Sequence, residues 1–270
     1  MVCKNVLSFV ALAILCAHPA LGLYTLKGGL DALNKARTDI QAVRDSINND
    51  YKAQTNLATC VRATWNLLFN EACPGVFDQA ITALQTQSAV GTVRLNLGMT
   101  YATWKHAKWI DEQNNQVLSH TGLAGSSFMQ RICEFNTNTN LAGAENLVGN
   151  TILGKATSEF YMMVDYIIDD GVSSRGHRIN LYNPIYTQVG LGIFKSAQAN
   201  GKEYIAITFA TDAYTCDKCS TITCAMQQEC GWTAYLAATG QADPCVSAGG
   251  STGGSTGGST GGSTGGSATQ

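Results

Sequence analysis

Residues 169–194 have the sequence DDGVSSRGHRINLYNPIYTQVGLGIF, which is the most informative segment of the chain. It joins two adjacent acids and a glycine-flanked histidine, His177, to an Asn-Pro turn and then to an apolar run. The apolar, β-branched residues 188–194 predict a β-strand. Residues 203–211 predict a second strand, and the polar turn at 199–201 between the two predicts a β-hairpin.

Two further motifs lie upstream of this stretch. His120 belongs to Ser-His-Thr-Gly (119–122), and Glu145 belongs to Gly-Ala-Glu-Asn-Leu (143–147). The chain has only 4 histidines, and two of them, His120 and His177, lie in glycine-containing motifs with acids nearby. Histidine is the commonest neutral metal ligand and titrates near neutral pH. The pattern therefore indicates a site rather than scattered core residues.

These motifs, in this order and spacing, resemble the CAP superfamily, also called the SCP or cysteine-rich secretory protein domain, in its bacterial-like branch. The resemblance extends from about Leu30 to about Ala213, with Ala144 where the family's G-E-N-[LI] motif usually has glycine. It implies an α+β fold, a three-layer α-β-α sandwich whose mixed or antiparallel sheet is covered by helices on both faces. We expect a small disulfide-rich C-terminal extension to follow it.

The resemblance also implies that two histidines and two acids converge on one cleft. Asp170 stands where animal members usually have Glu and is one methylene shorter, so Asp169 or Glu159 are substitutes for it. Two neutral imidazoles with acids behind them suit weak binding of Zn²⁺ or another divalent cation. The four expected positions are His120 and His177 as metal ligands, with Glu145 and Asp170 as the acids.

An architectural interpretation competes with this one. The RGHR and Asn-Pro residues can serve only to form a tight loop, Arg178 can pair with a buried acid, and Glu145 can accept N–H groups at a helix start. His106 lies in a predicted helix without flanking glycine or acids, so we interpret it as a solvated helix-face residue rather than a third ligand. Nothing specifies a Ser–His pair among Ser119, Ser126, Ser127 and Ser174.

Hydrophobic periodicity predicts several helices upstream of the strands. Their expected spans are 28–58, a continuation over 61–69, 77–87 after Pro74-Gly75, 95–117, and 157–169.

Composition and the chain ends define the organisation. Residues 1–22 have the charge and apolar run of a secretory signal peptide, and no later apolar segment predicts a transmembrane helix. The expected units are therefore the leader, a CAP-like domain over 28–214, a cysteine-rich extension over 215–246 and a Gly/Ser/Thr low-complexity tail over 247–270. A net charge of −2 without a Lys/Arg run argues against a nucleic-acid partner.

The cysteines agree with export. Eight remain after the leader, which predicts disulfides and no free thiol; Cys60–Cys73 is the favoured pair because it closes a short loop. Disulfides are favoured over a zinc knuckle in the C-terminal cluster, because zinc needs reduced thiolates. The candidates are Cys60, Cys73, Cys133, Cys216, Cys219, Cys224, Cys230 and Cys245.

Function is less defined than fold. The sequence favours an extracellular, non-enzymatic binding module for a sterol, a fatty acid or another small apolar ligand, or for an extracellular protein. It has neither an HExxH helix nor a GxSxG elbow. A metal- or Ser/His-dependent hydrolase and a structural protein of the cell surface or matrix are the alternatives.

Overall fold

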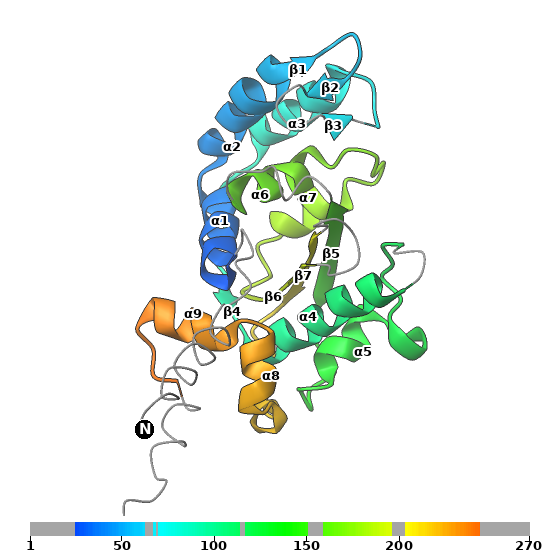
Figure 1. Ribbon diagram of the computed structural model, residues 1–270. Coiled ribbons are helices and arrows are strands. Elements are labelled where there is room, and N and C mark those ends of the chain that lie inside the picture. Colours follow the sequence, from blue (N-terminus) through cyan, green and yellow to red (C-terminus); the bar gives the residue numbers. More distant parts are fainter. Residues whose placement is uncertain are drawn as a thin grey trace, which may run out of the picture.

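The protein is described here from a computed structural model, which covers residues 25–62, 67–68, 70–113, 117–150, 159–195 and 203–243. Within these ranges the chain forms a mixed α/β fold around a four-stranded sheet (Figure 1). The elements are α1 (Leu26–Thr38), α2 (Ile40–Ser46), η1 (Ile47–Tyr51), η2 (Lys52–Gln54), β1 (Thr55–Asn56), β2 (Val61–Arg62), β3 (Leu67–Leu68), α3 (Gly75–Thr86), β4 (Arg94–Leu95), α4 (Leu97–Glu112), η3 (Leu123–Gly125), α5 (Phe128–Cys133), β5 (Gly143–Asn150), α6 (Glu159–Ile168), α7 (Gly176–Leu181), β6 (Gln188–Lys195), β7 (Glu203–Ala210), η4 (Cys219–Thr221), α8 (Cys224–Glu229) and α9 (Trp232–Thr239).

The sheet has the strand order β4-β6-β7-β5. Strands β6 and β7 are antiparallel, with Leu191 opposite Ile207, which confirms the two predicted strands and their pairing. Strand β5 adds antiparallel to the far side of β7, and β4 adds parallel to β6. The turn predicted at 199–201 lies outside the described residues.

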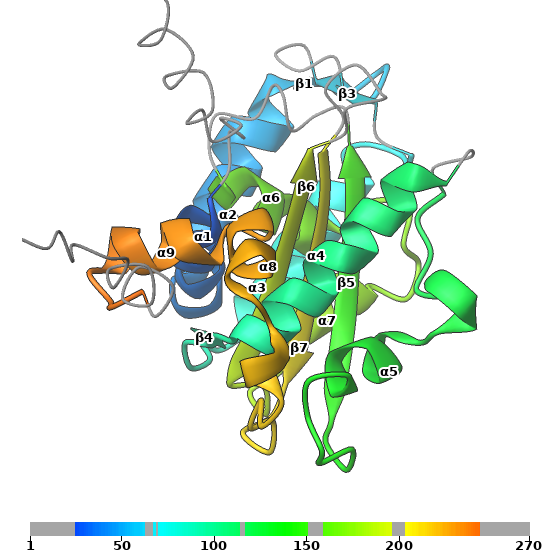
Figure 2. The same ribbon diagram turned by 60° about the horizontal axis from the view of Figure 1, so that its bottom comes forward.

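Alternate residues of β6 face helices on opposite sides of the sheet. A Cβ added to Gly190 would overlap the backbone carbonyl group of Met99, so helix α4 packs directly on this face. Leu191, on the other face, lies against Gly29 of α1, whose added Cβ would be 3.2 Å from Leu191 Cδ1. Successive strand residues point to opposite faces, so the sheet has helices on both. Figure 2 shows α4 crossing β5, β6 and β7.

The main core lies between the sheet and helices α1, α3 and α6. A buried arginine, Arg37, ties α1 to the turn that follows α7: its guanidinium donates to the carbonyl oxygens of Leu181 and Tyr186, the latter at 3.1 Å. Burial lowers the pKa of Arg37 to about 10. Fully buried members of the core include Leu33, Ala36, Phe77, Met163, Ile167, Ile207 and Phe209.

The predicted helix over 28–58 is divided. Asp39 separates α1 from α2 and its carboxylate accepts the N–H of Ala42 at 2.9 Å, so a new helix begins there. The prediction of helix over 61–69 is wrong where the structure describes this segment, at 61–62 and 67–68: Val61 pairs with Leu68 in a small antiparallel sheet beside α3 (Figure 1). Backbone pairing overrides the local helical pattern here. The helix predicted at 77–87 is confirmed as α3, which begins two residues earlier, and those predicted at 95–117 and 157–169 are confirmed as the shorter α4 and α6.

The disulfide prediction is confirmed in part. Cys60 is bonded to Cys73, as expected, and Cys216 to Cys219. Cys224 is also disulfide-bonded, and Cys245 lies outside the described residues. The expectation of no free thiol is wrong, because two cysteines carry free thiols, Cys133 and Cys230. Counting cysteines ignored burial: Cys230 is only 5% exposed within an apolar cluster.

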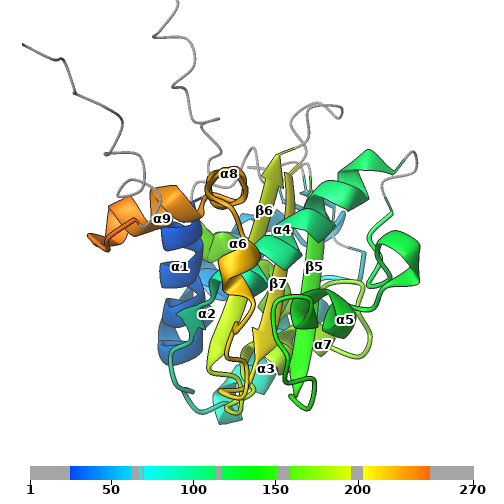
Figure 3. The same cartoon turned by 90° about the horizontal axis from the view of Figure 1, so that it is seen from below.

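The cysteine-rich segment packs against the main fold. Helix α9 contacts α1, and α8 contacts α4, as Figure 3 shows from below. No helix in the described part of the chain is long and apolar enough to span a membrane.

Candidate functional site

Strand β5 carries Glu145 into the interior. Its side chain is fully buried, and a buried carboxylate needs charged or hydrogen-bonding partners. Arg131 of α5 donates from Nη2 to both carboxylate oxygens, at 2.9 and 2.7 Å. The third partner is His120, whose Nδ1 lies 2.9 Å from Glu145 Oε1. The interpretation of Glu145 as an acceptor at a helix start is therefore wrong, since it lies in a strand and binds two side chains.

His120 is held at the surface. Its side chain is 59% exposed, while the carbonyl oxygen of the same residue accepts from Arg131 Nη1 at 3.1 Å. Because Nδ1 faces a carboxylate, the pairing favours the tautomer with the proton on Nδ1. The other ring nitrogen, Nε2, is then left with its lone pair available.

The second histidine, His177, is held by the turn between α6 and α7. Asp169 lies at the end of α6 with a positive φ of 60°. Its Oδ2 accepts the backbone N–H of His177 at 3.0 Å, and its Oδ1 lies 2.7 Å from His177 Nδ1. This second contact is short but is not a well-directed hydrogen bond, because Asp169 Oδ1 has no hydrogen-bond partner among the described residues. The imidazole also packs edge-on against Tyr166, with ring centroids 5.2 Å apart.

Asp170 does not contact either histidine in this arrangement, so its expected place is taken by Asp169. The Asp170 carboxylate points to the other side of the turn, where it accepts N–H groups of Asn70 and Glu71 at 2.6 and 2.8 Å. Adjacent residues in a turn point their side chains in different directions, which explains why Asp169 rather than Asp170 lies beside His177. Glu159, the other substitute, lies near the start of α1, where its Oε1 is 3.4 Å from the N–H of Thr25.

The two imidazole–carboxylate pairs are connected through neighbouring residues. Asn146, next to Glu145 in β5, donates from Nδ2 to the carbonyl oxygen of His177 at 3.1 Å. Burial raises the pKa of Tyr166 well above its ordinary value, and the charges of Glu145 and Asp169 add to that effect. Tyr166 therefore lies within electrostatic reach of both acids, one from each pair.

The buried arginine of the RGHR motif is part of this architecture. Arg178 donates to the carbonyl oxygens of Ile167 and Ile168, at 2.6 and 3.1 Å, and so satisfies the last carbonyls of α6. We expected the Arg178 side chain to pair with a buried acid, but its contact with Asp169 Oδ2 is made by the backbone N–H, at 3.4 Å.

The donor set partly fits a divalent cation. In zinc sites a carboxylate commonly fixes one imidazole nitrogen while the other binds the metal, and both histidines have that arrangement. In the described ranges, no group of three or more His, Cys, Asp or Glu side chains is placed to hold an ion. Two imidazoles alone make an open site of low affinity.

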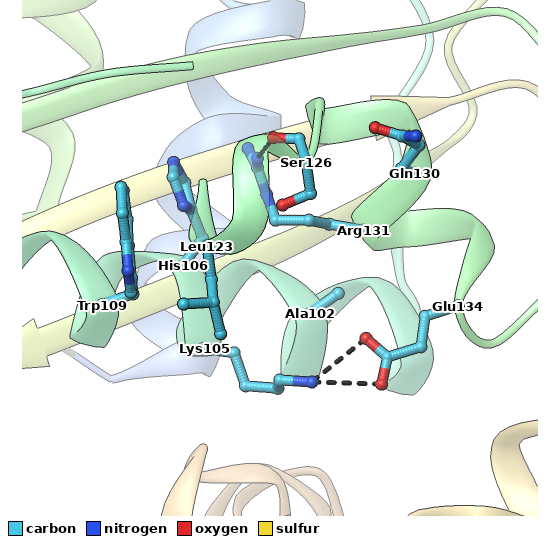
Figure 4. Close-up of a pocket in the computed structure, with 9 residues that line it drawn as sticks. All are labelled: Ala102, Lys105, His106, Trp109, Leu123, Ser126, Gln130, Arg131 and Glu134. Atoms are coloured by element: carbon cyan, nitrogen blue, oxygen red, sulfur yellow. Dashed lines mark hydrogen bonds and ion pairs between the residues drawn. The ribbon is translucent and has the colours of Figure 1, made fainter. Parts of the chain in front are cut away.

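A cavity of about 430 Å³ lies between α4 and the segment 123–134. Figure 4 shows side chains of α4 facing those of this segment, with the Lys105–Glu134 ion pair at one edge. Arg131 also lines the cavity, so one guanidinium lies at the cavity wall and binds Glu145. The lining residues are Ala102, Lys105, His106, Trp109, Leu123, Ser126, Gln130, Arg131 and Glu134.

His106 is a cavity residue, so its interpretation as a solvated helix-face histidine is wrong. It is only 2% exposed. Its Nε2 lies 2.8 Å from the carbonyl oxygen of Ser119, and its ring stacks on Trp109 with centroids 5.6 Å apart. Burial, followed by the charge of Arg131, lowers the pKa of His106. The helical period alone did not show that the 119–131 segment folds back over this helix face.

Among the described residues, no hydroxyl contacts the free nitrogen of His120 or His177 in the way a nucleophile would. Two of the four candidate serines have backbone roles: Ser119 Oγ accepts the N–H of Thr121 at 3.0 Å, and Ser127 Oγ caps α5. The serines therefore give no support to a Ser–His hydrolase.

Comparisons with known proteins add little to this description. No protein-family model matches the chain, and no curated protein matches it. Among solved structures, an outer surface protein from Borrelia burgdorferi is similar at a TM-score of 0.35 and 16% identity, over 45% of this chain and 79% of that protein. A likeness at this level supports no statement about function.

Proposed function

We propose that this protein is an exported, non-enzymatic binding module that takes a small apolar ligand in the cavity along α4. The cavity is the observation that carries the proposal. Its volume of about 430 Å³ lies in the range of small-molecule sites, which are mostly apolar with a few placed polar groups. Trp109, Leu123 and Ala102 supply the apolar surface.

The charges around the cavity favour a neutral occupant over an ionic one. Lys105 is neutralised by Glu134 at 3.1 Å, and Arg131 is neutralised by the buried Glu145. A sterol or another uncharged apolar molecule is therefore a suitable class of ligand, with most of its contact through hydrocarbon. Export is inferred from the N-terminal leader and is compatible with the disulfides.

The resemblance to the CAP superfamily belongs to this proposal. The motifs supply the expectation, and the order β4-β6-β7-β5 with helices on both faces is compatible with the expected three-layer sandwich. The pairing of both motif histidines with acids is likewise compatible with it.

The test is chemical extraction of the exported protein, followed by mass spectrometry of what co-purifies. A filling variant, Ala102→Leu, places extra carbon in the cavity, because Ala102 is a lining residue that is 2% exposed. We expect lower recovery of bound ligand from this variant. Ala238→Leu, on the exposed face of α9, is the matched control and retains the ligand. Equal recovery from all three proteins would contradict the proposal.

A weak divalent-cation site at His120 and His177 is a second part of the proposal. It is favoured by one observation, that both rings hold a carboxylate at Nδ1 and leave Nε2 to bind. Zinc would supply charge and orient a bound anion or water there. Calorimetric titration with zinc is expected to show binding that His120→Ala combined with His177→Ala removes. Identical heats in the two proteins would leave the pairs an architectural role only.

A further inference from the structure

His106 lines the cavity along α4 and carries an unpaired buried nitrogen. Its Nδ1 is buried and has no hydrogen-bond partner. The atom lies beside the turn that carries Ser126, another residue of the cavity lining, since a Cβ added to Gly122 would lie 3.1 Å from His106 Nδ1 and 3.0 Å from Ser126 Oγ. Figure 4 shows the imidazole between Trp109 and the Ser126–Arg131 side. A buried polar atom without a partner costs free energy, so a ligand that satisfies it gains affinity.

The chemistry of Nδ1 follows from the other nitrogen. Nε2 lies 2.8 Å from the carbonyl oxygen of Ser119, and a carbonyl only accepts. Nε2 therefore carries the proton and donates. In a neutral imidazole one nitrogen donates and the other accepts, so Nδ1 is an acceptor. The neutral form is favoured here by burial and by the nearby Arg131.

The surroundings then limit the ligand class. The group that meets Nδ1 must be a donor, either O–H or N–H. The two cations at the wall, Lys105 and Arg131, are each paired with an acid, so nothing there is left to neutralise an ionic head group. Trp109 stacks on His106 at an interplanar angle of 15°, so two nearly parallel aromatic rings belong to the cavity lining. Stacked rings favour a planar or ring-shaped body.

We propose that the cavity along α4 binds an uncharged, ring-bearing alcohol or phenol whose hydroxyl donates to His106 Nδ1. The inference rests on the proposed function and deepens it by naming the class of ligand. The ring lies against the surface formed by Trp109 and Leu123, and the hydroxyl points to the Ser126 side.

Two isosteric probes separate the hydroxyl from the hydrocarbon. 4-Ethylphenol and 4-ethyltoluene differ only in an O–H against a methyl group, and binding of each to the full chain is measured by calorimetry. We expect the phenol to bind at least tenfold more tightly, about 1.4 kcal/mol. In wild-type protein labelled with ¹⁵N-histidine, the Nδ1 resonance of His106 is expected to move with the phenol and not with the toluene. This measurement needs no variant.

Two variants test whether His106 Nδ1 is the atom that accepts the hydrogen bond from the phenol. H106Q keeps a side-chain N–H at the Nε2 position for the Ser119 carbonyl and removes the Nδ1 acceptor, so the phenol preference is expected to disappear. K108Q, on the same helix and outside the cavity lining, is the control and retains the preference. A preference that persists in H106Q overturns the inference.

The remaining outcomes distinguish the two proposals. Equal binding of phenol and toluene by wild-type protein overturns the inference about the hydroxyl while leaving apolar binding intact. Absence of binding by either probe overturns the inference together with the function assigned to the cavity.

Discussion

Replacing Glu71 by Gln tests how the turn that carries Asp169 is held. Glu71 receives two N–H groups from Arg175, at 2.5 Å on Oε1 and 2.6 Å on Oε2, and its Oε1 also accepts the N–H of Gly171 at 2.8 Å. Arg175 in turn donates to the carbonyl oxygen of Asp169 at 2.6 Å. The Glu71–Arg175 ion pair therefore stabilises the turn that contains Asp169, the residue that positions His177.

The size of the contribution that this ion pair makes to stability follows from the pKa of Glu71. The Arg175 guanidinium lowers the pKa of this carboxyl from 4.5 to about 2. At about 1.4 kcal/mol for each tenfold change in acidity, this corresponds to an upper limit of about 3 kcal/mol. The side chain is 33% exposed, so solvent screening reduces the expected contribution to about 1–2 kcal/mol.

Because the pKa of Glu71 is lower in the folded protein than in the unfolded chain, its contribution to stability decreases as the pH falls. The contribution is fully present above about pH 4.5, where the unfolded carboxyl is ionised, and is lost as the pH falls toward about 2. Glu71→Gln is therefore expected to lower the free energy of unfolding by about 1–2 kcal/mol at pH 7 and to cost little at pH 2.

Urea unfolding followed by circular dichroism between pH 7 and pH 2 measures this difference. Glu112→Gln is the matched control, because Glu112 makes only a loose 4.0 Å pair with Lys108 on the surface of α4. A Glu71→Gln difference that stays constant over the whole pH range, or one no larger than that of Glu112→Gln, would refute the reasoning.

Three more changes test other parts of the structure. Gly190→Ala is expected to destabilise the fold by about 2–3 kcal/mol in chemical denaturation, because the added methyl meets the backbone of α4. Cys133 and Cys230 are expected to be alkylated in unfolded, unreduced protein, by peptide mass spectrometry. In the folded protein Cys230 reacts slowly, since burial raises the pKa of its thiol to about 11. Asp169→Asn is expected to lower zinc affinity at least tenfold in calorimetry, because Asp169 orients His177.

Each of these has a control within the chain. Gly91→Ala adds a methyl where no atom lies within 4 Å and should change stability little. The Cys60–Cys73 disulfide stays unmodified until a reductant is added. Asp170→Asn leaves the contacts of His177 in place, so equal zinc affinities for the Asp169 and Asp170 variants would contradict the assignment of Asp169.

Local sequence patterns predicted the sheet and its helices better than they predicted the site. The apolar, β-branched runs of β6 and β7 and the periodic α4 and α6 are long enough for the pattern to identify the element. The helix predicted over 61–69 is wrong at residues 61–62 and 67–68, since their conformation depends on pairing between Val61 and Leu68. Such pairing leaves no periodic signal in a segment this short.

The site shows the same limit at the scale of single side chains. Short motifs surround His120, His177 and Glu145, which is why the sequence indicates them as candidates. Arg131, which binds Glu145, has no motif of its own, and its role depends on where α5 packs. The choice between Asp169 and its neighbour depends on a φ of 60° at Asp169, which the DDG sequence is compatible with but does not specify.

Arg131 also bears on how strongly the two histidines bind a cation. An acid beside a metal-binding imidazole favours binding partly through its negative charge. At Glu145 that charge is already compensated, because Arg131 places two N–H groups on the same carboxylate within 2.9 Å. The carboxylate can still fix the ring of His120, but it adds little electrostatic attraction for a divalent ion. The same guanidinium that makes the cavity wall neutral thus argues for a weak cation site at His120, and both parts of the proposed function depend on one buried ion pair.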